Sequence, residues 1–337
     1  MKVLRLTLLA AAVLVTALLA YALSRAFYTD RPVGFQRVVV TDPAGRPMTT
    51  GIWYPTESTP LPTTLLSFNL ISVAKDAAVS GARRPLILIS HGNGGGPGSH
   101  VDLALALAQK GFIVAAPMHA GDNFADQSAA GSVRWLPDRV RQIRSVLDYM
   151  QQQWPSRAQI DERRVGIFGF SAGAFTALAS IGGEPDLSLL ASHCLTTPEF
   201  VCQLLKDARS PLLDPAAVPV ASEFAADGRI KAAVLVAPGL GFSFPASGLT
   251  AIGGPVQVWT GSADTNVPTT TNARPISEAL GGRAELREVA GASHFSFLAP
   301  CRLFGPPVFC RDADGFDRER AHLQMNDAIA EFFGKAL

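Results

Sequence analysis

The sequence of 337 residues predicts an α/β fold with a mostly parallel, doubly wound β-sheet. Three observations lead to this prediction. Short uninterrupted apolar runs, such as "PLILIS" at 85–90, are typical of strands buried on both faces of a sheet. These runs alternate with segments whose apolar residues recur at helical spacing. Glycine-rich turns follow several runs, at the strand ends where such sheets carry their chemistry.

The expected elements follow in chain order. Residues 34–56 should form two strands around the turn "DPAGRP", and the Pro-, Ser- and Thr-rich stretch 55–84 should wrap the surface. Further strands are expected at 85–90, 112–117, 165–170, 230–238, 255–261 and 284–291, with helices at 101–111, 138–154, 172–183, 273–282 and 318–337. The apolar faces of two of these helices carry Val140, Ile143, Leu147 and Met150, and Leu323, Met325, Ile329 and Phe333.

Residues 184–228 interrupt the alternation. They contain many prolines, one cysteine pair and apolar clusters such as "LSLLA" and "FVCQLL". We therefore expect an inserted, cap-like segment of short helices over the site. The segment would belong to one large domain that spans 27–337, a length ample for a buried core.

The composition excludes several classes of protein. Apolar residues make up 48% of the chain, charged residues 17%, and the formal net charge is +1. A nucleic-acid binder is not expected, because the chain has no basic excess or dense Lys/Arg stripe to neutralise phosphates. A disordered chain would be poorer in apolar residues and richer in charge. The balance is that of a globular protein.

The N-terminal segment 1–26 has the pattern of an export signal. Lys2 and Arg5 precede a long uncharged run, which contains Ala20 and Ala22 in an A-x-A arrangement. These features are typical of a secretory signal peptide. The run is almost long enough to span a bilayer, so an uncleaved anchor is the alternative, and only then would the protein contact a membrane. In both cases we expect the domain to be exported, either periplasmic or secreted.

The four cysteines agree with export. Four cysteines allow three connectivities, and short local loops favour disulfides within each of two close pairs. A zinc site is poorly supported, because neither pair has C-x-x-C spacing. The expected pairs are Cys194–Cys202 and Cys301–Cys310.

Ser171 is the candidate nucleophile. It is the centre of "GFSAG" (169–173), directly after the apolar run 165–170 and directly before a helical segment. This context gives the G-x-S-x-G pattern its meaning, because a sharp strand-to-helix turn exposes the serine and needs glycines on both sides. The turn also places the serine at a helix N-terminus, where amide groups favour negative charge. A packing turn without catalytic function is the alternative.

A serine hydroxyl needs a base to accept its proton, so a histidine partner is expected. His294 in "GASHFSF" lies on a loop after a late strand and is the candidate. The other histidines suit other roles: His91 and His100 would shape the glycine loop, His119 could line the pocket, His193 lies in the insertion, and His322 would be a surface or packing residue of the last helix.

The imidazole in turn needs a carboxylate that holds its tautomer and stabilises the imidazolium. Asp264 in "GSADTNVP" lies just beyond the strand at 255–261, where a loop can reach the histidine. The chain order Ser171, Asp264, His294 is the order of the α/β-hydrolase fold. Weaker candidates, interpreted as solvated loop or cap residues, are Asp122, Asp312, Asp314 and Asp317.

An oxyanion hole completes the predicted site. Charge develops on the carbonyl oxygen during attack, and backbone N–H groups aimed at it stabilise the transition state. We expect one donor from Ala172, directly after the nucleophile, and the other from Asn93 in "HGNGGG", the loop after the strand at 85–90. A phosphate-binding function for this loop is weak, because neither a P-loop nor a complete dinucleotide fingerprint is present.

Several motifs together carry a family resemblance. They are "LISHGNGG", "GFSAG", "GSADTNVP", "GASHFSFLAPC" and the tail "GFDRERAHLQMNDAIAEFF". With them the chain resembles the exported bacterial dienelactone-hydrolase-like proteins related to platelet-activating-factor acetylhydrolases, from about Gly34 onward. The resemblance implies an α/β-hydrolase that cleaves carboxylic esters with the same three positions as its triad. True dienelactone hydrolases use a cysteine nucleophile and this chain has Ser171, so the family name is no evidence for dienelactone as the substrate.

The sequence therefore predicts an exported serine esterase acting through an acyl-enzyme, with no metal or organic cofactor required. The apolar insertion and the segment "FSFLAP" favour an acyl or aromatic ester as substrate rather than a highly charged one. A peptidase or amidase of the same fold is one alternative, although no large extra domain is present to select peptides. A non-catalytic scaffold that acts as a binding protein is the other, although a scaffold has no need of all three triad residues.

Overall fold

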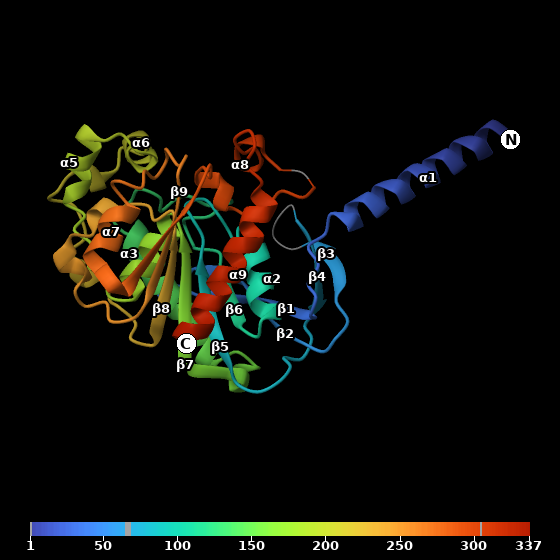
Figure 1. The fold of residues 1–337 in the computed structure, drawn as a ribbon, viewed down its shortest axis with the longest axis horizontal. Coiled ribbons are helices and arrows are strands. Elements are labelled where there is room, and N and C mark those ends of the chain that lie inside the picture. Colours follow the sequence, from blue (N-terminus) through green and yellow to red (C-terminus); the bar gives the residue numbers. More distant parts are fainter. Residues whose placement is uncertain (1, 65–68, 304) are drawn as a thin grey trace.

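The computed structural model describes residues 2–64, 69–303 and 305–337. Within these residues, one ten-stranded sheet forms the centre of the domain (Figure 1). From one edge to the other its strands are β10 (Ala284–Val289), β9 (Val256–Gly261), β8 (Ile230–Val236), β7 (Ile160–Phe170), β5 (Arg84–Ser90), β6 (Ile113–Pro117), β2 (Pro47–Pro55), β1 (Val33–Thr41), β4 (Leu70–Lys75) and β3 (Leu61–Thr64).

The sheet is mostly parallel, which confirms the predicted fold class. The six strands from β10 to β6 pair in parallel. The β1–β2 hairpin then joins β6 in the antiparallel sense. Parallel strands end at a common edge, so the loops after β5, β7, β8, β9 and β10 meet there. This edge is the place where the sequence predicts the site.

Helices cover both faces of the sheet and divide the core in two. On the central strand β5, Leu86 and Leu88 face one core with α3 (Trp135–Gln152), α4 (Ala172–Ser180) and α7 (Ala273–Leu280). Ile87 and Ile89 face the other core with α2 (Val101–Gln109) and α9 (Arg318–Ala336), which lie side by side in Figure 1. The alternation is the two-residue period of a strand buried on both faces.

The stretch 55–84 differs from the expectation. It carries β3 and β4 rather than only a surface wrap, and β4 pairs in parallel with β1. Ile71 and Val73 of β4 are buried in the second core, and Ser72 and Ala74 on the opposite face of the strand are buried as well. The Pro and Ser content of the stretch conceals these two short strands; part of the stretch, 65–68, lies outside the described residues.

The last helix, α9, also differs in detail from the sequence expectation. Met325, Ile329 and Phe333 are buried as expected, but Leu323 is 66% exposed. His322 is buried in its place, because spacings of three and four residues put it on the face of Met325 and Ile329. A polar residue thus occupies the buried position.

The insertion 184–228 consists of short helices packed on the first core. It contains α5 (Leu189–Thr196), α6 (Phe200–Asp207) and the 3₁₀ turns η2 (Pro211–Leu213) and η3 (Ala221–Glu223). Leu190, Leu205 and Leu212 are buried in that core. The Cys194–Cys202 disulfide ties α5 to α6, and Cys301–Cys310 closes the loop around the short helix α8 (Pro307–Cys310); both are the pairs favoured by spacing.

The N-terminal helix α1 (Lys2–Ser24) projects away from the domain (Figure 1). Its segment Arg5–Ser24 has a mean hydropathy of 2.4 and, of the described helices, is the one long and apolar enough to cross a membrane. Packing begins immediately after it, since Ala26 and Phe27 are buried. An apolar N-terminal helix fits a signal sequence, and the two disulfides indicate a location outside the cytoplasm.

Candidate active site

Ser171 lies on a strained turn between β7 and α4. Its φ of 54° and ψ of −120° are unusual for a residue with a side chain. The flanking glycines permit the turn: a Cβ on Gly169 would lie 2.1 Å from the Gly173 carbonyl oxygen, and a Cβ on Gly173 would lie 1.9 Å from that of Ser90. No side chain fits at either glycine, so the tight turn requires both of them.

His294 and Asp264 approach Ser171 from the neighbouring strand ends. His294 begins the turn η7 (His294–Phe297) after β10, and its Nε2 lies 3.0 Å from Ser171 Oγ. Its Nδ1 lies 2.8 Å from Asp264 Oδ2, in the loop after β9. The other carboxylate oxygen accepts hydrogen bonds from the backbone N–H groups of Asn266 and Val267. The three predicted side chains therefore form a continuous hydrogen-bonded line.

A second histidine supports the His294 turn from behind. His322 Nε2 contacts the carbonyl oxygen of Ser296, and its Nδ1 lies 2.6 Å from Asp102 Oδ2. Ser296 also closes a capping box with Ser293 at the start of η7. His322 is thus a packing residue, one of the two roles expected for it, but its contact with the His294 turn was not foreseen. The only sequence signal was its place on the buried face of α9.

The two predicted oxyanion donors border Ser171. Ala172 is the first residue of α4, and Asn93 lies in the loop after β5. That loop approaches the serine closely, because a Cβ on Gly92 would lie 3.3 Å from Ser171 Cβ. Within the described residues, neither the N–H of Asn93 nor that of Ala172 donates a hydrogen bond. Both N–H groups are therefore available to donate a hydrogen bond to a bound ligand.

A narrow cleft opens beside Ser171. The space amounts to about 340 Å³, part of which is open to solvent, and its exposed lining is mostly apolar. Helix α6 of the insertion supplies one wall, Trp135 and Leu240 supply others, and the floor reaches Ser171. The lining residues are Trp135, Ser171, Ala172, Glu199, Phe200, Val201, Leu204, Gly239, Leu240, Asn266 and Val267. Among the described residues, no group of three or more metal-ligating side chains gathers.

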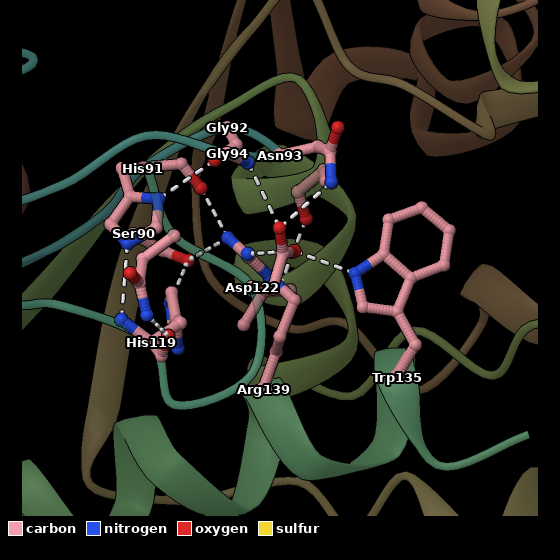
Figure 2. Close-up of polar contacts among 12 residues, drawn as sticks. Ser90, His91, Gly92, Asn93, Gly94, His119, Asp122, Trp135 and Arg139 are labelled. Atoms are coloured by element: carbon pink, nitrogen blue, oxygen red, sulfur yellow. Dashed lines mark hydrogen bonds and ion pairs between the residues drawn. The ribbon is translucent and has the colours of Figure 1, made fainter. Parts of the chain in front are cut away.

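Asp122 corrects a sequence interpretation. It was expected to be a solvated loop residue, but it is 1% exposed and forms an ion pair with Arg139 of α3 (Figure 2). The residues after β6 fold back beneath the loop after β5, which removes the carboxylate from water. Of the weaker candidates, Asp312 forms an ion pair with Arg318, and Asp317 caps the N-terminus of α9. These are the roles expected of loop and cap residues.

Three histidines near the loop after β5 are fully buried and uncharged at neutral pH. Burial and the charge of Arg139 lower the pKa of His91 to about 4. Burial lowers the pKa of His100 to about 3, and that of His119 well below its usual value. His91 Nδ1 donates to the Gly92 carbonyl oxygen while its Nε2 accepts from the N–H of His119. His91 thus shapes the loop as predicted, whereas His119 lies beneath it and does not line the cleft.

The chain has an α/β-hydrolase fold, and one solved structure shows the likeness over almost its whole length. This is the ferulic acid esterase from Streptomyces cinnamoneus, which superposes with a TM-score of 0.62 at 19% sequence identity and covers 93% of this chain and 92% of its own. No protein-family model matches the sequence, and no curated protein matches it significantly. At 19% sequence identity the comparison supports the fold alone, so a chemical function must be argued from the geometry of the site.

Proposed function

We propose that the protein is a serine hydrolase of carboxylic esters. The observation that carries the proposal is the line from Asp264 through His294 to Ser171, with both contacts of the imidazole at hydrogen-bond distance. The strained backbone of Ser171 supports it, because strain of this kind gathers at functional residues. The structurally similar protein is itself named an esterase.

The proposed reaction has two halves. Ser171 Oγ attacks the ester carbonyl carbon while His294 Nε2 accepts its proton, and the N–H groups of Asn93 and Ala172 stabilise the oxyanion. The C–O bond then breaks, and the alcohol leaves with the proton from His294. Water attacks the acyl-enzyme with His294 again as base, which releases the acid and returns the hydroxyl to Ser171.

The cleft favours a compact apolar acyl group. Trp135, Val201, Leu204 and Leu240 contribute apolar surface, and the wall of α6 limits the length of a chain that extends from Ser171. An aromatic acyl group also suits these walls, and the similar structure is named for ferulic acid. We therefore propose small acyl or aromatic esters as the substrate class.

A series of p-nitrophenyl esters with the full chain in detergent tests this function. We expect turnover of acetate and butyrate, with kcat/KM falling by about tenfold or more between butyrate and dodecanoate, because the cleft is short. A fluorophosphonate probe should label Ser171 in the folded protein and not after denaturation, as mass spectrometry of the labelled peptide would establish. Folded protein that neither labels nor hydrolyses any ester would instead support the non-catalytic scaffold.

We also propose that the signal in residues 1–26 directs export and that cleavage after Ala22 removes its apolar run, which leaves a periplasmic or secreted enzyme. The apolar run of α1 and the packing that begins at Ala26 support this division of the chain. N-terminal sequencing of the exported protein tests it: a start after Ala22 fits cleavage, whereas an intact Met1 together with membrane pelleting fits the anchor.

A further inference from the structure

A buried ion pair lies directly behind the proposed oxyanion hole. Asp122 Oδ2 is 2.5 Å from Arg139 Nη1, and each side chain is 1% exposed (Figure 2). The indole N–H of Trp135 donates to the same carboxylate oxygen at 2.6 Å. Burial alone would raise the pKa of Asp122, but the Arg139 charge and the hydrogen bonds lower it below its usual value. Both partners are therefore charged.

Asp122 and Arg139 hold the loop that carries one oxyanion donor. Asp122 Oδ1 accepts from the side-chain amide of Asn93 at 2.8 Å and from the N–H of Gly94 at 2.9 Å. Arg139 Nη2 donates to the carbonyl oxygen of His91. These contacts lie on both sides of the Asn93 N–H, so they fix the orientation of the peptide groups around it (Figure 2).

Arg139 also reaches the helix that carries the other donor. Its Nε donates to Thr176 Oγ1 at 3.1 Å, and that hydroxyl donates to the carbonyl oxygen of Ala172 at 2.9 Å. One guanidinium group thus connects the loop after β5 with the first turn of α4. Its planar fork serves several acceptors in fixed directions, which a single ammonium group cannot do.

A purely stabilising role does not account for this arrangement well. A buried ion pair loses so much hydration that apolar residues of the same size often give equal stability. Oxyanion stabilisation, in contrast, depends on donors preorganised to within a fraction of an ångström. The contacts of this pair converge on the two segments where such accuracy matters.

We propose that Asp122 and Arg139 are positioning residues that set the separation and direction of the Asn93 and Ala172 N–H groups. The inference rests on the proposed esterase function and deepens it. It predicts that weakening the network lowers transition-state stabilisation while substrate binding stays unchanged.

Two variants test the inference in the full chain. Arg139→Lys keeps the charge and removes the fork, and Asn93→Ala removes one tether but keeps the backbone N–H. Each should lower kcat for p-nitrophenyl butyrate by about 10- to 100-fold and leave KM within about twofold. This decrease is smaller than the one expected for complete loss of an oxyanion donor, because the N–H group remains and only its orientation is disturbed. Arg141→Lys, the same change on the solvent side of α3, is the matched control and should leave kcat unchanged.

A transition-state analogue separates positioning from mere stability. A trifluoromethyl ketone forms a tetrahedral adduct with the serine, whose oxyanion occupies the hole, so its inhibition constant should rise by the same factor as kcat falls. Variants with a lower Tm but unchanged kcat and inhibition constant would overturn the inference. Asn93→Ala, on a partly exposed loop, keeps the test decisive if Arg139→Lys does not fold. Wild-type protein without ester turnover would instead overturn the proposed function, and this inference with it.

Discussion

Replacement of Ser171 by alanine is expected to abolish ester hydrolysis without unfolding the protein. The hydroxyl is the proposed nucleophile, and its removal leaves only the oxyanion donors and substrate binding to accelerate attack by water. We expect kcat for p-nitrophenyl butyrate to fall by roughly 10⁴- to 10⁶-fold. Asp264→Asn should cost about 10⁴-fold, because an amide there favours the wrong tautomer of His294.

Ser192→Ala is the matched control for this experiment. Ser192 is an exposed serine on α5, outside the residues that line the cleft, so its variant should retain wild-type turnover. A Ser171→Ala protein that keeps more than about a tenth of the activity would contradict the mechanism, since removal of a triad nucleophile costs far more. Thermal unfolding of both variants should match the wild type within a few degrees, which separates lost chemistry from lost fold.

Acid is expected to unfold the domain steeply below about pH 6, because His91, His100 and His119 are buried without charge. Their pKa values in the folded protein are about 4, about 3 and well below normal, against roughly 6.5 in the unfolded chain. In the window between these values the unfolded chain binds more protons. The free energy of unfolding therefore falls as the pH falls, by up to about 4 kcal/mol per pH unit for three such groups.

The buried carboxylate of Asp102 is expected to lower the free energy of unfolding further at more acidic pH. Burial opposes ionisation of Asp102, but His322 and Asn326 stabilise the charged form and lower its pKa to about 2. Its contribution is present above the unfolded value near 3.9 and is lost as the pH falls from there towards 2. Urea unfolding at pH 7.5, 6.5, 5.5 and 4.5 measures the upper window. His100→Gln should reduce the slope by about a third, and a stability that stays constant from pH 7 to pH 5 would show that the histidines are not buried as described.

The sequence predicts the parallel part of the fold well, for a physical reason. Strands buried on both faces must be apolar throughout, so β5, β6 and β7 stand out from any other kind of segment. β3 and β4 pair in the antiparallel sense at the edge of the sheet, where β3 is mostly exposed and the four middle residues of β4 are buried. A strand of only four to six residues among prolines and serines carries too little signal to distinguish it from a loop.

The candidate site likewise contains some residues that the sequence predicts and others that it does not. Ser171, Asp264 and His294 are predictable, because each follows a recognisable strand in an order that the fold dictates. Asp122 and Arg139 are not, because their burial arises only when α3 and two loops meet. Arg139 stands four residues before Ile143 on the buried face of α3, yet a charged side chain is normally assigned to solvent, and only its tertiary partners explain why it is buried.

The disulfide between α5 and α6 is expected to make the shape of the cleft depend on the redox surroundings. Val201 and Leu204 of α6 form a wall of the cleft, and Cys202 on the same helix is bonded to Cys194. In a reducing cytoplasm that bond is absent, so a newly made chain would hold its nucleophile without a fixed wall beside it. The selectivity for the acyl group would then be complete only once the bond has formed outside the cytoplasm. Dithiothreitol should accordingly broaden the acyl-chain preference before it abolishes turnover; a preference unaffected by reduction would show that packing alone holds the wall.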